Sequence, residues 1–188
     1  MAEPSPAAGR LLQREDALLV VIDVQERLLP HVAGPEEVVA NIVKLLRFAR
    51  TVGIPVVLTE QLKLGSTVSE ISRELPGITP ISKTEFGCLA CEGFAEALRN
   101  SGRKALVLVG LEAHICVMQT ALQTISEYTV HVVGDAVSSR SLANRDAALQ
   151  RMAQAGVVLT STEMLMYEVL ARAGTDEFKA VLELVRSL

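Results

Sequence analysis

The stretch ALLVVIDV, Ala17–Val24, decides how the rest of the chain folds in our interpretation. It begins with six consecutive apolar residues, several of them β-branched, and carries one charged residue, Asp23, near its end. An uninterrupted apolar run of this kind is typical of a strand that is buried on both faces, as in a parallel sheet covered by helices. The stretch therefore predicts a central strand of an α/β domain.

Further strands alternate with helices along the sequence. Apolar residues recur at helical spacing between Gly34 and Gly53, and short apolar runs follow at intervals. Such alternation predicts β-α-β units, so we expect a single-domain, three-layer α/β/α sandwich with a parallel sheet. Thr160 and Glu163 have the spacing of a capping box for a late helix. The other strands are expected at Ile54–Glu60, Ile81–Lys83, Lys104–Gly110, Thr129–Asp135 and 157–160, and the helices at 34–53, 88–102, 115–125, 144–156, 162–174 and 178–185.

Composition narrows the class of function. With 188 residues and 49% hydrophobic residues, the chain is long enough for one sizeable core, which we expect at 15–188 after a disordered tail at 1–14. The net charge is −4, with acidic and basic residues mixed throughout, which argues against a nucleic-acid partner because phosphate binding needs a basic patch. No apolar run approaches the roughly 20 residues that span a bilayer, so no membrane partner is expected.

Three cysteines in a chain of this size are typical of a reducing compartment rather than of a disulfide framework. We therefore expect a cytoplasmic protein. The Ala- and Val-rich helices carry more apolar surface than one small domain needs, which favours a homo-oligomer.

Three reactive side chains follow strands of the expected sheet. Asp23 ends the first strand, Lys83 ends the third, and Cys116 follows the fourth. Ligands bind beyond the carboxyl ends of parallel strands, so an acid, an amine and a thiol are expected at one edge. Taken singly, Asp23 also fits a local cap, Lys83 a surface lysine and Cys116 a buried structural cysteine. Together they fit a site for nucleophilic attack on an sp² carbon, such as an amide carbonyl.

The position of Cys116 near the start of a helix predicts a reactive thiol. The positive end of the helix dipole and a nearby lysine both lower the pKa of a thiol. We therefore expect Cys116 to react with iodoacetamide near neutral pH, with Asp23 as the group that takes its proton.

Four segments together resemble the isochorismatase-like cysteine hydrolases. They are VVIDVQ (Val20–Gln25), ISKTEFG (Ile81–Gly87), VLVGLEAHICVMQTA (Val107–Ala121) and VVGDAVSSR (Val132–Arg140), within a match from about Leu18 to Leu165. The resemblance implies a Rossmann-like, six-stranded parallel sheet of order 3-2-1-4-5-6 and a catalytic triad of Asp23, Lys83 and Cys116. It also implies a cis peptide bond between Leu111 and Glu112, which would aim the N–H groups of Glu112 and Cys116 at an oxyanion.

The chain departs from the nicotinamidases of this family in two places. Those enzymes hold a metal with an Asp-x-His after the second strand, whereas here Thr59–Thr67 reads TEQLKLGST and no histidine lies between His31 and His114. We therefore expect no metal and no cofactor. Ala113 stands where those enzymes have threonine, which argues against nicotinamide as the substrate.

Several residues near the expected site have an open role. We interpret Cys88 and Cys91, a C-x-x-C, as incidental cysteines at a helix start, with redox sensing as the alternative. The loop at Ser138, Ser139 and Arg140 fits either an anion-binding loop or a helix cap with a salt-bridged arginine. The candidates for the substrate pocket are Gln25, Glu60, Gln61, Phe86 and His114.

The sequence thus predicts a metal-independent cysteine hydrolase. It would cleave a C–N bond in a small amide or imide through a thioester on Cys116. The alternatives are a non-catalytic member of the family that acts as an interaction protein, and a redox-sensing protein that pairs Cys116 with Cys88 or Cys91.

Overall fold

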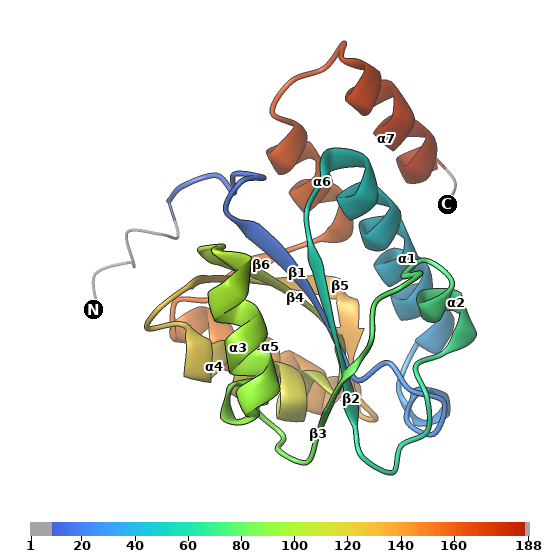
Figure 1. Ribbon diagram of the computed structural model, residues 1–188, viewed down its shortest axis with the longest axis vertical. Helices are drawn as coiled ribbons and strands as arrows, with labels where there is room; N and C mark the ends of the chain where they lie inside the picture. Colours follow the sequence, from blue (N-terminus) through green and yellow to red (C-terminus); the bar gives the residue numbers. More distant parts are fainter. Residues whose placement is uncertain (1–8, 187–188) are drawn as a thin grey trace.

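The strand β1 (Ala17–Ile22) lies inside the sheet, and each of its residues is buried. It pairs in parallel with β2 (Val56–Gln61) on one side and with β4 (Ala105–Leu111) on the other. The computed structural model describes residues 9–186 and contains a six-stranded parallel sheet of order β3-β2-β1-β4-β5-β6 (Figure 1). The fold class and strand order are therefore as predicted. The remaining strands are β3 (Ile81–Lys83), β5 (Thr129–Ser138) and β6 (Val158–Thr160), of which β3 and β6 form the edges of the sheet.

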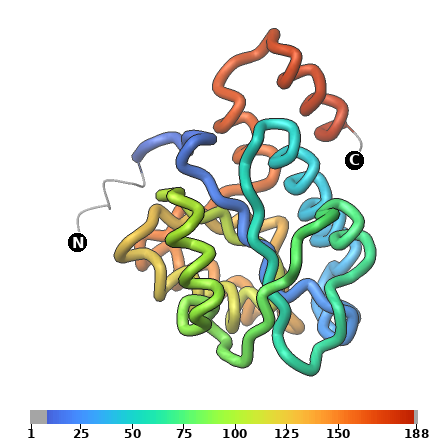
Figure 2. Tube along the Cα trace, viewed as in Figure 1, coloured from blue at the N-terminus to red at the C-terminus, as the bar shows by residue number. Residues whose placement is uncertain are grey.

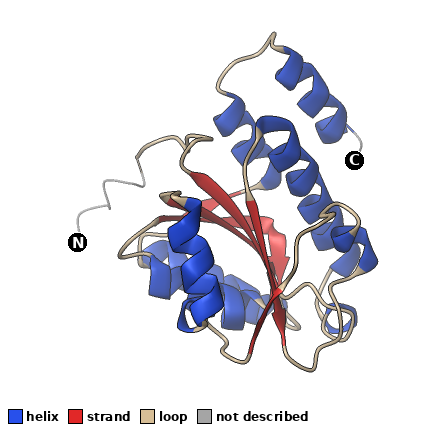
Figure 3. Cartoon of the chain, viewed as in Figure 1, coloured by secondary structure: helices blue, strands red, loops and turns tan. Residues whose placement is uncertain are grey.

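Helices cover both faces of the sheet (Figure 3). One layer contains α1, α6 and α7, with the short α2 beside α1, and the other contains α3, α4 and α5, as the chain trace shows (Figure 2). The helices are α1 (Pro35–Val52), α2 (Ser69–Ser72), α3 (Glu92–Ser101), α4 (Met118–Thr124), α5 (Leu142–Gln154), α6 (Thr162–Leu170) and α7 (Asp176–Arg186), and the shorter helical turns are η1 (Leu29–His31), η2 (Cys88–Ala90) and η3 (Ala113–Val117).

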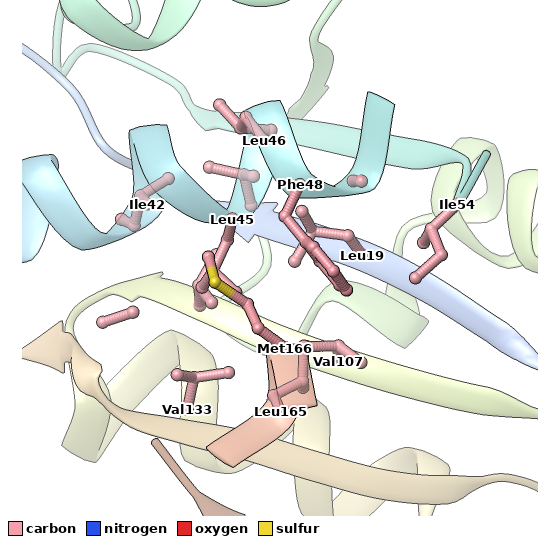
Figure 4. Close-up of a cluster of buried hydrophobic side chains, with 14 of the residues drawn as sticks. Leu19, Ile42, Leu45, Leu46, Phe48, Ile54, Val107, Val133, Leu165 and Met166 are labelled. Atoms are coloured by element: carbon pink, nitrogen blue, oxygen red, sulfur yellow. The ribbon is translucent and has the colours of Figure 1, made fainter. Parts of the chain in front are cut away.

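The sheet separates two apolar clusters. Leu19 and Val21 of β1 face the cluster under α1 and α6, whereas Ile22 faces the cluster under α3, α4 and α5, as the alternation of side chains in a strand requires. In the first cluster, Phe48 of α1 and Met166 of α6 pack over the sheet (Figure 4). With aromatics at 3% of the chain, the core is built mostly from aliphatic side chains, with Phe48 and Phe94 as its buried aromatic residues.

Residues 1–8, which make up most of the predicted N-terminal tail, lie outside the described residues. The last residues of the predicted tail contact the domain. Leu12 is buried, and the guanidinium of Arg14 donates two hydrogen bonds to the carboxylate of Glu177. The domain boundary at residue 15 stays a prediction.

The predicted cap of the late helix is wrong by one residue. Ser161 has extended backbone angles and its hydroxyl accepts a hydrogen bond from the N–H of Met164, so Ser161 is the N-cap of α6. Thr160 is the last residue of β6 and is held in the sheet, which excludes it from the capping position.

Gly110 lets β4 approach the end of β1. Its φ is +116°, and a Cβ atom at this position would lie 2.1 Å from the carbonyl oxygen of Ile22. Because the clash is with backbone, it cannot be relieved by a side-chain rotation. Gly110 therefore fixes the spacing between the strands that precede Asp23 and Cys116.

We expect Gly110→Ala to lower the free energy of unfolding by at least about 4 kcal/mol, because the change combines a backbone clash with an unfavourable φ. Gly134→Ala is the matched control, since its Cβ would lie 3.5 Å from the carbonyl oxygen of Thr160, an ordinary contact. Its effect should stay below about 1 kcal/mol. Urea denaturation of both variants measures the difference, and equal stabilities would show that the close approach at Gly110 does not constrain the fold.

Candidate active site

Asp23 follows β1 in a left-handed conformation, with a φ of +53°. Asp occupies this region more readily than most residues, although it is uncommon for any residue except Gly. If β1 continued as a regular strand, the side chain of Asp23 would point to the face of the sheet opposite to that of Ile22. Its carboxylate instead contacts Thr59. Thr59 lies on the same face as Ile22, because the preceding residue, Leu58, belongs to the cluster on the other face. The left-handed residue thus turns the carboxylate toward the layer that contains α3 and α4.

Lys83 reaches Asp23 across β2 with its long side chain. Its Nζ lies 2.6 Å from Oδ2 of Asp23, and both side chains are fully buried. The ammonium also donates to Oε1 of Gln61 at 2.7 Å and to the carbonyl of Glu85 at 3.1 Å. Burial opposes the charged form of Lys83, but the negative charge of Asp23 raises its pKa above the ordinary value. Lys83 therefore stays protonated in a fully hydrogen-bonded ion pair.

Cys116 lies on the π-helical turn η3, whereas the sequence predicts an α-helix from Ile115. The regular helix α4 begins after this turn, and single π-helical turns are frequent at functional sites. The Sγ of Cys116 lies 3.9 Å from Nζ of Lys83, and the residue is 6% exposed. The structure thus brings Asp23, Lys83 and Cys116 together in one buried cluster.

The thiol of Cys116 is neutral at rest. Burial, followed by the negative charge of Asp23, raises the pKa of Cys116 to about 12, and the opposing charge of Lys83 does not compensate. The prediction of a low pKa is therefore wrong, and on this pKa we no longer expect rapid reaction with iodoacetamide near neutral pH. Loss of hydration outweighs the dipole of the short helix that follows. A neutral thiol needs a base when it attacks, and Asp23 is the carboxylate beside it.

Thr120 connects the turn of Cys116 to Cys88. Its hydroxyl donates to the carbonyl of Cys116 at 2.7 Å and accepts from the N–H of Cys88 at 2.9 Å. Cys88 is buried, and burial is the main reason why its pKa is raised to about 11. The positive charge of Lys83 acts in the opposite direction and lowers this pKa. Cys88, which we interpret from the sequence as incidental, therefore lies beside the triad.

The peptide bond between Leu111 and Glu112 is cis, as the resemblance implies. The side chain of Glu112 is buried and points to the loop after β5, where its Oε1 lies 2.8 Å from Nε of Arg140. Beside it, Nδ1 of His114 and the hydroxyl of Ser139 are hydrogen-bonded at 2.9 Å. Of the two interpretations of this loop, the salt-bridged arginine describes what Arg140 does in the structure.

Three of the five pocket candidates have their polar atoms engaged by the fold. The amide of Gln25 is buried and bonds three backbone groups, and the carboxylate of Glu60 accepts two hydrogen bonds from the loop after β2. Gln61 binds Lys83. Phe86, which is 56% exposed, and His114 remain the candidates for contact with a substrate.

Within residues 9–186, no group of three or more His, Cys, Asp or Glu side chains is arranged to hold a metal ion. Metal independence stays a prediction about the reaction.

Thr59, Cys88 and Thr120 contact or adjoin the triad, yet the sequence does not single them out as site residues. The signal for Thr59 is its place within β2, where a hydroxyl directly follows the apolar residues Val56, Val57 and Leu58. Thr120 lies four residues after Cys116, the spacing at which a threonine hydroxyl bonds a carbonyl in the preceding turn. Cys88 has no comparable signal, because its position depends on the path of the loop after β3.

Comparison with known proteins places these features in a family. A model of the isochorismatase domain matches residues 17–164. The chain is 37% identical over 195 residues to the secreted isochorismatase effector Isc1 of Phytophthora sojae, covering 99% of this chain and 93% of that protein. The structure is similar to the MAR1 ribonuclease of Caenorhabditis elegans, with a TM-score of 0.88 and 33% identity over 95% of this chain and 93% of that one. It is also similar to a structure of YcaC from Pseudomonas aeruginosa that contains hexane-2,5-diol and covalent acrylamide. The TM-score is 0.87 and the identity is 28%, over 94% of this chain and 92% of that one.

We expect Asp23→Asn to make the thiol of Cys116 more acidic, because it removes the negative charge that disfavours the thiolate and leaves Lys83 in place. At pH 8 the rate of alkylation of Cys116 by iodoacetamide should rise at least about tenfold, since each unit by which the pKa falls gives tenfold more thiolate. Peptide mapping by mass spectrometry measures the rate at each cysteine. An unchanged or slower rate at Cys116 in a folded variant would show that Asp23 does not hold this thiol in its neutral form.

Proposed function

The chain belongs to the isochorismatase domain family, and on that premise we propose that it is a metal-independent cysteine hydrolase acting on the C–N bond of a small amide or imide. The observation that carries the proposal is the buried cluster in which Nζ of Lys83 lies 2.6 Å from Oδ2 of Asp23 and 3.9 Å from Sγ of Cys116. A base, a cation and a thiol within contact distance are the groups that thiol-based acyl transfer requires.

The first step forms the acyl-enzyme. Asp23 takes the proton of the Cys116 thiol as sulfur attacks the carbonyl carbon, and the C=O electron pair moves to oxygen. The N–H groups of Glu112 and Cys116 are the proposed donors to that oxyanion. When the oxyanion collapses, the C–N bond breaks and Asp23 returns its proton to the leaving nitrogen. The products are a thioester on Cys116 and the nitrogen leaving group, which is ammonia or an amine from an amide and a carboxamide from an imide.

The second step releases the acid. Water attacks the thioester carbon while Asp23 accepts a proton, and the C–S bond breaks as that proton passes to the sulfur of Cys116. Lys83 takes no proton in either step. Its N–H groups donate to Asp23, Gln61 and Glu85, so its role is to hold the carboxylate of Asp23 in place.

The covalent acrylamide of the Pseudomonas aeruginosa relative supports a nucleophile in this fold. Acrylamide is an electrophile that alkylates thiols, and it is itself a small amide. It is therefore a suitable probe for Cys116, and the neutral, buried thiol predicts slow alkylation unless the amide group is bound next to Asp23.

The name of the Caenorhabditis elegans relative raises ribonuclease activity as a second candidate. Two observations favour the amide. The triad is almost fully buried, which fits a small substrate, and the ammonium of Lys83 is already hydrogen-bonded and so is not free to bind phosphate. RNA is nevertheless included as a substrate in the test below.

We also propose that the protein works in the cytoplasm as a homo-oligomer. Its three cysteines are free thiols, as a reducing compartment allows, and Leu142 and Met164 are large apolar side chains that are more than half exposed. Among the described helices, none has the length and apolar character needed to cross a bilayer. The Phytophthora sojae relative is named as secreted, so the location of this chain is best tested directly with a tagged protein.

Incubation with a panel of small primary amides and cyclic imides should release ammonia or a ring-opened acid, and rapid quenching should give a mass increase equal to one acyl group on Cys116. Cys116→Ala should lose at least about 1,000-fold in rate because it removes the sulfur that forms the proposed thioester. Cys91→Ala, which removes a half-buried thiol, is the matched control and should keep its activity.

Hydrolysis that survives in Cys116→Ala would contradict the proposal. So would cleavage of RNA by the wild-type protein, at a rate unaffected by Cys116→Ala, with every amide and imide left intact.

A further inference from the structure

Strand β2 lies between β1 and β3, so it separates the two strands whose ends carry Asp23 and Lys83. Two of its side chains, at alternate positions on one face, bridge this gap. The hydroxyl of Thr59 donates to Oδ1 of Asp23 at 2.8 Å, and Oε1 of Gln61 accepts from Nζ of Lys83 at 2.7 Å. The ion pair is therefore held at both ends by β2.

We propose that Thr59 is a positioning residue of the triad, which holds Oδ1 of Asp23 so that Oδ2 faces Lys83 and the carboxylate stays in place beside Cys116. The proposal rests on the proposed function, because it concerns the residue that acts as the base. It differs from a purely structural role in predicting a change in the protonation of Asp23 itself.

Burial makes this hydrogen bond necessary. Asp23 and Thr59 are both 0% exposed. A buried carboxylate oxygen that has no hydrogen-bond donor strongly destabilises the folded protein. Lys83 does not serve both oxygens, because its other two N–H groups are taken by Gln61 and the carbonyl of Glu85. Thr59 therefore supplies the donor that the second oxygen of Asp23 requires.

The titratable groups around Asp23 leave a clear window for the measurement. Lys83 faces it from β3, Cys116 from η3 and Cys88 from η2. The pKa of Lys83 is raised above its ordinary value, and those of Cys88 and Cys116 are raised to about 11 and about 12. Below pH 9, a change at the carboxyl carbon of Asp23 therefore reports on Asp23 and not on these neighbours.

The experiment follows the carboxyl carbon signal of Asp23 by NMR between pH 3 and pH 9 in the wild-type protein, Thr59→Val and Thr59→Ser. Valine keeps the shape of threonine and removes the hydroxyl, so protonation of Asp23 should move to higher pH by about one unit, the size expected for a hydrogen bond to a charged group. Serine keeps the hydroxyl and should leave the wild-type titration unchanged.

Thr67→Val is the matched control. The hydroxyl of Thr67 is also buried and also donates to a carboxylate, that of Glu60 at 2.7 Å, but it does not contact Asp23. Its loss should cost similar stability and leave the titration of Asp23 in place. If Thr59→Val does not fold, Thr59→Ala also removes the hydroxyl, with less volume, and should move the titration in the same direction.

The outcomes separate this inference from the proposed function. An Asp23 titration that is the same in Thr59→Val, or Thr59→Ala, as in the wild type would overturn the role of Thr59, even if Cys116 forms an acyl-enzyme. A shifted titration would support that role even if no amide is hydrolysed, and in that case it is the hydrolase assignment that fails. Once an amide substrate has been identified, kcat/KM can be measured as a function of pH. The acidic side of this profile should move together with the NMR titration in Thr59→Val and stay in place in Thr59→Ser.

Discussion

The buried ion pair between Lys83 and Asp23 is the interaction on which the site depends. Removing two charges from water costs several kcal/mol for each ion, and this cost is offset only when every polar atom finds a partner. Lys83 meets that condition with three oxygens, and Asp23 meets it with Lys83 and Thr59. The carboxyl ends of three adjacent strands are therefore tied to one another through side chains, beyond the backbone hydrogen bonds of the sheet.

Two features of the backbone bring the thiol of Cys116 next to this ion pair. Asp23 takes a left-handed conformation that directs its carboxylate to the correct face, and Gly110 allows β4 to approach β1 before the turn that carries Cys116. The result is a thiol that is held neutral by burial and by the adjacent carboxylate. In the mechanism that we propose, such a site would keep Cys116 unreactive toward general electrophiles and make its activation depend on proton transfer to Asp23.

Much of the fold can be predicted from the sequence. The apolar run at Ala17–Val24 and the alternation of further apolar runs with helical segments are typical of a parallel sheet covered by helices on both faces. The strand order and the pairing of Asp23 with Lys83 and Cys116 depend in addition on the family resemblance. What could not be predicted depends on local geometry. Periodicity does not show that Asp23 leaves its strand left-handed, that Ser161 rather than Thr160 caps α6, or that Thr59 and Cys88 adjoin the triad. The pKa of Cys116 was predicted with the wrong sign because the sequence shows its neighbours but not how completely water is excluded from them.

We propose that in the wild-type protein Cys116 is a neutral thiol at pH 7 and that Asp23 takes its proton when it attacks a substrate. The most direct test is the pH dependence of thiolate absorbance at about 240 nm, taken as the difference between the wild-type protein and Cys116→Ala so that the other cysteines cancel. A neutral Cys116 gives no thiolate signal at pH 7, and the signal should appear only as the pH approaches its pKa of about 12. A full thiolate signal at pH 7 would contradict this proposal, because Cys116 would then need no base.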